Sequence, residues 1–98
     1  MLPVGTSLVA LDILLAVALI GLRNERVTVK GLFSSLPHSV MGIRHNFDRL
    51  IADGWIELKQ VEFDARIKYV QPTRKLKMKA AEIAELAQTR IERHMQKP

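Results

Sequence analysis

Apolar residues between positions 39 and 73 change their spacing partway along the segment. Up to position 52 they recur every three or four residues, which places them on one face of an α-helix. This apolar face consists of Val40, Ile43, Phe47, Leu50 and Ile51. From Trp55 to Val61 apolar and polar residues alternate instead, which is typical of a strand with one buried face. The pattern predicts a helix over residues 39–53 and a β-hairpin over residues 55–72.

The residues between these elements indicate where each one ends. Ser39 can cap the helix at its start, and Gly54 suits the left-handed conformation that commonly follows a helix end. Residues 62–66 are expected to form a charged tip, and residues 67–70 the returning strand. A helix, a tight stop and a hairpin in this order are typical of a winged helix. In such a fold the helix can enter a groove of DNA while the tip reaches the neighbouring backbone or minor groove.

Three more helices are predicted, so that the 98 residues form one domain over residues 1–98. Residues 6–22 are apolar on almost every side, and we expect this helix to be buried against its own domain and against a partner. Thr28 can cap a helix over residues 28–36, and Thr73 can cap a last helix over residues 73–95. The predicted fold class is mainly α with a small β-wing (α+β), a winged helix-turn-helix whose long terminal helices pair in a dimer.

The apolar run near the N-terminus is too short to cross a membrane as a helix. Residues 7–22 contain one charge, at Asp12. They span about 24 Å as a helix, short of the ~30 Å hydrocarbon core. No positive charge precedes the run, which argues against a signal peptide, although a targeting segment remains the minor alternative. The absence of Cys fits a reducing compartment. We therefore expect a cytoplasmic protein without a membrane partner.

The net charge of +5 and the pI near 10.0 favour a polyanionic partner, either nucleic acid or an acidic membrane surface.

Catalysis has little support. The three histidines, His38, His45 and His94, lack the spacing of metal ligands. The chain has neither a nucleophile in a recognisable elbow nor a Gly-rich loop. The sequence thus predicts no enzyme, no catalytic or metal-binding residue, and no cofactor.

The face of helix 39–53 opposite its apolar stripe is the candidate DNA-reading surface. His45 and Arg49, one turn apart, are the best candidates for contacts to base edges, because Arg commonly reads guanine. Arg44 lies on the flank and suits a phosphate. The complete predicted set of DNA-binding residues is His38, Ser39, Met41, Gly42, Arg44, His45, Arg49, Arg66 and Lys68. An ordinary solvated face remains the alternative for each of them.

On the wing, Arg66 is expected at the tip, where an Arg can enter a narrow minor groove. Asp64, two residues earlier, can pair with Arg66 and hold the tip in shape. Lys68 follows on the returning strand. The alternative is a charged hairpin that has no partner.

The last helix carries an apolar stripe with several Ala residues, which suggests a close approach of another helix. A helix of this length has little of its own small domain to pack on, so pairing with a second copy is expected. The predicted dimer interface consists of Leu11, Leu15, Leu76, Ala80, Ile83, Ala87 and Ile91. The alternative is that the last helix folds back onto the first one within a monomer.

The wing segment resembles that of the MarR family of bacterial transcription regulators. Residues 64–73 are similar to its wing motif, with Asp64, Arg66 and Thr73 matching, whereas Ala65 stands in place of an Arg. Residues 48–56 and 28–36 resemble the end of the family's recognition helix and the helix before it. The resemblance implies a dimer on pseudo-palindromic DNA, with residues 39–49 in the major groove and Arg66 in the minor groove. Typical members are longer, which makes a small-molecule effector doubtful here.

Together these observations predict a homodimeric, sequence-specific regulator of transcription that binds double-stranded DNA. The alternative is a winged-helix module that binds a protein and no DNA. Asp48 on the exposed helix face and the mixed charge of the wing favour that alternative.

Overall fold

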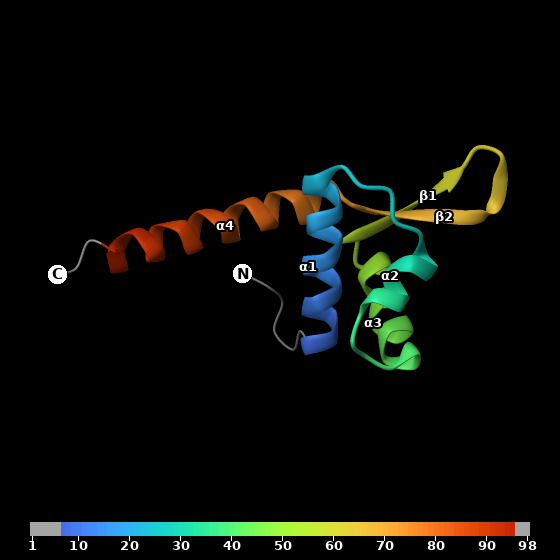
Figure 1. Cartoon of the computed structure of the whole chain (residues 1–98), viewed down its shortest axis with the longest axis horizontal. Helices are drawn as coiled ribbons and strands as arrows, with labels where there is room; N and C mark the ends of the chain where they lie inside the picture. The colour runs from blue at the N-terminus through green and yellow to red at the C-terminus, as the bar shows by residue number, and fades with distance from the viewer. Residues whose placement is uncertain (1–6, 96–98) are drawn as a thin grey trace.

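The computed structural model describes residues 7–95, with side chains as far as residue 89. Its elements follow the order α1, α2, α3, β1, β2, α4 (Figure 1). Their bounds are Leu8–Arg23 for α1, Val29–Ser35 for α2, Val40–Ala52 for α3, Ile56–Val61 for β1, Asp64–Pro72 for β2 and Arg74–Met95 for α4. The strands form a two-stranded antiparallel hairpin. The predicted fold class, a winged helix-turn-helix, is confirmed. Position 6, where the first helix was expected to begin, lies outside the described residues.

Hydroxyl side chains begin all four helices, which explains why the helices start where they do. In each case the hydroxyl oxygen accepts a hydrogen bond from the backbone N–H three residues later. These capping residues are Ser7, Thr28, Ser39 and Thr73, with distances of 3.1, 3.0, 3.2 and 3.3 Å. Left-handed residues end two of the helices, with φ of 53° at Asn24 after α1 and 81° at Gly54 after α3. Local chemistry therefore sets most of the helix boundaries.

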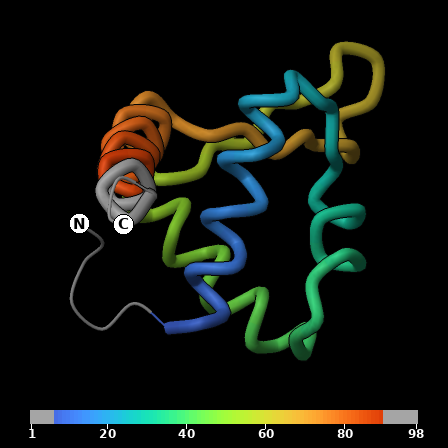
Figure 2. The backbone as a smooth tube through the Cα atoms, turned by 60° about the vertical axis from the view of Figure 1, so that its left-hand side comes forward, coloured from blue at the N-terminus to red at the C-terminus, as the bar shows by residue number. Residues whose placement is uncertain are grey.

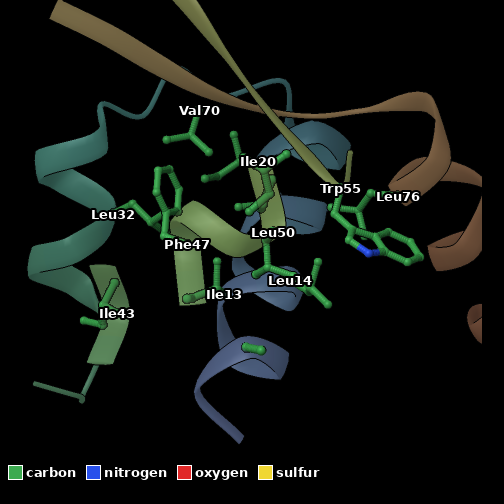
Figure 3. Packing of buried hydrophobic residues seen from close by; sticks show 13 residues of the cluster. Ile13, Leu14, Ile20, Leu32, Ile43, Phe47, Leu50, Trp55, Val70 and Leu76 are labelled. Atoms are coloured by element: carbon green, nitrogen blue, oxygen red, sulfur yellow. The ribbon is translucent and has the colours of Figure 1, made fainter. Parts of the chain in front are cut away.

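The hydrophobic core lies where α1 packs against α3, with α2 and the base of the wing closing its sides (Figures 2 and 3). Ile13 of α1 and Phe47 of α3 are at most 1% exposed. Leu32 of α2 points toward Phe47, and Val70 of β2 lies above it (Figure 3). This core fixes the orientation of α3 and leaves its opposite face to solvent.

Helix α1 has two apolar faces, and its own domain covers only one of them. The covered face carries Ile13, Leu14 and Val17, each at most 3% exposed. The other face is open to solvent and carries Leu8, Leu15, Leu19 and Leu22, which are 46–80% exposed. Leu11 lies between the faces and is half-buried. The described helices include none that is long and apolar enough to cross a membrane.

Helix α4 leaves the domain after its first two turns (Figure 1). Every described side chain from residue 81 to residue 89 is exposed, including Ile83 at 40% and Leu86 at 63%. The Cα radius of gyration is 15.3 Å, larger than the ~13 Å usual for about 100 residues in a compact domain. The expected alternative, in which the last helix folds back along the first, is therefore not what the structure shows for the described residues.

Two apolar residues lie elsewhere than their spacing predicts. Leu76 was placed on the dimer surface, but it is 3% exposed and belongs to the core, because the first turn of α4 still packs on its own domain. Val40 was placed in the core but is 67% exposed, because the first turn of α3 borders an open groove beside α2.

The tip of the wing is shorter than expected. The turn contains only Glu62 and Phe63, and β2 begins at Asp64. The hairpin register passes from Gln60–Lys68 directly to Val61–Asp64, so residues 65–67 form a bulge. The expected tip residues 64–66 thus belong to β2, because the bulge absorbs residues that an even register would have placed in the loop.

Candidate nucleic-acid interface

A groove of about 830 Å³ separates α2 and α3 from the wing. Its floor is mainly apolar and includes Phe33 and Ile51. Four cationic residues line it, namely Lys30, Arg44, Arg66 and Lys68. Arg44, Arg66 and Lys68 were predicted DNA-binding residues. Arg44 belongs to α3 and the other two belong to β2, so the fold brings together residues that are distant in sequence. The arrangement can accept an elongated anion along the groove.

Arg44 is held in place by two contacts. Its guanidinium carbon lies 4.8 Å from the centre of the Phe33 ring, and Nη1 lies 3.9 Å from Oδ1 of Asp48. The Phe33 ring in turn meets Phe47 edge to face, with 5.1 Å between the ring centres. Stacking on an aromatic ring limits the freedom of the Arg side chain. Arg44 is therefore positioned at the groove on a support that reaches into the core.

Arg66 lies in the middle of the wing bulge, with its side chain 90% exposed. Oδ1 of Asp64 accepts hydrogen bonds from the backbone N–H and from Nε of Arg66, at 3.0 and 3.2 Å. The predicted pairing of these residues is thus confirmed. The side-chain and backbone hydrogen bonds from Arg66 hold the pKa of Asp64 below its usual value. The carboxylate stays charged and fixes the direction of the guanidinium.

The exposed face of α3 presents Met41, His45 and Arg49 to solvent. Ser39 is also exposed, but its hydroxyl caps the helix. Gly42 has a structural role next to that cap, because a Cβ there would lie 3.1 Å from the Ser39 oxygen. The bare backbone at Gly42 therefore has a local explanation that needs no ligand.

The structure corrects the prediction that His38 lies on this exposed face. Its Nε2 lies 2.6 Å from Oδ2 of Asp12, and the side chain is 17% exposed. A second polar link joins the start of α1 to α3 itself, where the Ser7 hydroxyl donates to Oδ1 of Asn46 at 3.1 Å. His38 and Asp12 thus join α1 to the turn before α3. This contact explains the single charge in the apolar run of α1.

Sequence reasoning missed two residues of the groove, Lys30 and Phe33. Lys30 is the only cation in α2, and nothing in its spacing connects it with Arg44 or with the wing. It also missed Leu86, which is exposed on α4 one turn after Ile83. Among the described residues no cluster of three His, Asp or Glu side chains could hold a metal ion.

Solved structures with the same fold include several MarR-family regulators. FabT from Streptococcus pneumoniae, solved in complex with DNA, is 17% identical over 89% of this chain and 60% of its own, with a TM-score of 0.68. MarR from E. coli, in a mutant form, is 17% identical over 94% and 65%, with a TM-score of 0.69. ZitR from Lactococcus lactis, also a mutant, is 17% identical over 98% and 62%, with a TM-score of 0.66.

These likenesses establish that the fold is the winged helix-turn-helix of MarR-family regulators. The chain spans between 60% and 65% of the length of these three proteins. No family model matches the sequence, and no curated protein does either.

Proposed function

We propose that the protein is a sequence-specific, double-stranded DNA-binding regulator of transcription, which acts in the cytoplasm as a homodimer. The observation that carries this proposal is the groove between α2, α3 and β2, because its cations adjoin the exposed face of α3. A DNA backbone along the groove would bring α3 to the major groove and the wing to the flanking minor groove. The DNA complex of the structurally similar FabT gives further support.

The residues of this surface divide into two roles. His45 and Arg49 read base edges, since they lie on the exposed face of α3 and an Arg fork matches guanine. Lys30, Arg44 and Lys68 contact phosphates, because they line the groove, whereas His45 and Arg49 do not. Arg66 enters the minor groove, where negative potential is concentrated.

The dimer interface follows from the apolar surface that remains open. The outer face of α1 carries four exposed Leu residues, and α4 extends away from the side of the molecule that holds α2, α3 and the wing tip (Figure 1). Ala80, Ile83 and Ala87 lie along α4, with Ile91 farther on, beyond the described side chains. Pairing through α1 and α4 would cover these faces and place two α3 helices about 34 Å apart on the same side of DNA.

The decisive experiment is selection of binding sites from random duplex DNA by the purified protein. We expect an enriched palindrome with half-sites about one helical turn apart, and log affinity that falls with log salt by about 0.9 per phosphate contacted. A flat salt dependence with no enriched sequence would refute DNA binding. It would favour the protein-interaction module, to which the exposed acids Asp48 and Glu62 would be suited.

Three substitutions separate the roles of the basic residues. Arg49→Ala should cost about 1–3 kcal/mol on the selected site and relax discrimination at one base pair per half-site. Arg44→Ala should weaken binding to all sequences nearly equally, and Arg66→Ala should matter most where the flanking minor groove is narrow. Arg23→Ala is the matched control, because it removes the same charge from the end of α1. Equal losses for all four variants on selected and random DNA would contradict the assignment.

Sedimentation tests the assembly. Ile83→Lys should convert dimers to monomers at tens of micromolar, because a charge would be buried in the interface. Glu85→Lys introduces Lys on the same helix at a position outside the apolar stripe, and it should leave the dimer intact. A monomeric wild-type protein at that concentration would refute the homodimer.

A further inference from the structure

The most exposed large hydrophobic side chain among the described residues belongs to Phe63, at 88%. Phe63 occupies the two-residue turn between β1 and β2. Full burial of a Phe side chain is favourable by about 1.5–3 kcal/mol, so an exposed ring at the end of a hairpin is well suited to contact another surface. The site described above does not use this ring.

Contacts within the hairpin hold the turn that carries Phe63. Val61 precedes it, is 7% exposed and pairs with Asp64 across the hairpin. Asp64 follows it, and its carboxylate binds both the backbone and the side chain of Arg66. The pairing and the hydrogen bonds hold the two ends of the turn together, next to a ring that is 88% exposed.

The position of the turn identifies what it can reach. Figure 1 shows the wing tip at the end of the molecule opposite the far end of α4, on the side where α2 and α3 lie. Arg66 and Lys68 of the same hairpin line the groove beside α3. A duplex bound along that groove would therefore meet the turn at its flanking minor groove.

The charge at the turn indicates the kind of contact. Glu62 is exposed next to Phe63 and carries a charge that phosphates repel. The turn itself, residues 62 and 63, contains no cation. Attraction to phosphates therefore cannot hold this turn on DNA, whereas an apolar ring can contact sugars and base faces. Apolar side chains that enter the minor groove act as wedges between base steps.

We propose that Phe63 is a wedge that enters the minor groove beside Arg66 and partly unstacks one base step. This inference rests on the proposed DNA-binding function. It assigns the wing two separate contributions, a charged one from Arg66 and an apolar one from Phe63. It also predicts a preference for flexible pyrimidine–purine steps where the wing lands, because those steps unstack most easily.

The test uses the full-length protein and its selected duplex, with 2-aminopurine placed at the flanking step. Binding of the wild type should raise the fluorescence of this base as it loses its stacking. Phe63→Ala should abolish that rise and weaken binding roughly five- to tenfold, with no change in the salt slope. Glu62→Gln is the matched control, which should strengthen binding, alter the salt dependence and leave the fluorescence rise intact.

The outcomes separate this inference from the function on which it rests. Wild-type protein that binds no duplex would refute both. Tight, salt-dependent binding by the wild type, with equal affinity and equal fluorescence for Phe63→Ala, would overturn only the wedge. Thermal melting by circular dichroism checks that Phe63→Ala is folded, as expected for such an exposed position.

Discussion

Gly21 lies in the last turn of α1, at the point where this helix crosses the end of β2. A Cβ at Gly21 would lie 2.5 Å from Cγ and 3.3 Å from Cδ of Pro72. Pro72 is buried, and its ring cannot rotate away as a flexible side chain could. The substitution Gly21→Ala therefore has two opposite effects on stability. The higher helix propensity of Ala stabilises the fold, and the steric clash with Pro72 destabilises it.

The magnitude follows from these two effects. Ala is favoured over Gly in a helix interior by about 1 kcal/mol. Overpacking a filled site costs about 1–3 kcal/mol. The clash should prevail, so we expect Gly21→Ala to lower the free energy of unfolding by about 1 kcal/mol. For a domain of this size that loss corresponds to a melting temperature lower by about 4–8 °C.

A double-mutant cycle isolates the clash. Pro72→Ala removes Cγ and Cδ, the two atoms that a Cβ at Gly21 would meet most closely. In that background Gly21→Ala should become stabilising by about 1 kcal/mol, because only the helix propensity remains. Urea unfolding followed by circular dichroism, at one protein concentration, measures all four proteins. If Gly21→Ala stabilises the protein equally with and without Pro72, the proposed steric contact is wrong.

Two further predictions concern polar contacts. Asp12→Ala should lower the free energy of unfolding by about 1–2 kcal/mol, since it leaves the half-buried ring of His38 without its partner; an unchanged urea midpoint would contradict this. Because Arg66 lowers the pKa of Asp64 from 3.8, any stability from their bond is present above that value and is lost as the pH falls through the folded pKa. The difference in urea midpoint between the wild type and Asp64→Asn should therefore disappear in strong acid, and a difference that persists there would have another cause.

The sequence by itself determined the order and type of the elements. Their signals are local, because a hydroxyl cap acts within three residues and an apolar face repeats within one turn. The stripe through Ile43, Phe47 and Leu50 predicts the buried face of α3, and all three residues are at most 7% exposed. Gly54 predicts the end of α3 by the same local reasoning, and its φ is 81°.

Only the tertiary structure decided which side chains meet across the chain. His38 lies 26 residues from Asp12, and no periodicity connects them, so its place against α1 could not be foreseen. The same holds for the groove, where Lys30 joins Arg44 and Arg66 because α2, α3 and the wing fold around one core. Leu76 shows the opposite error. It lies on the regular apolar stripe of α4 and was predicted at the dimer surface, but the domain covers the first turn of α4 and buries it. Spacing along the chain identifies the face of an element, whereas the packing of the other elements decides what covers that face.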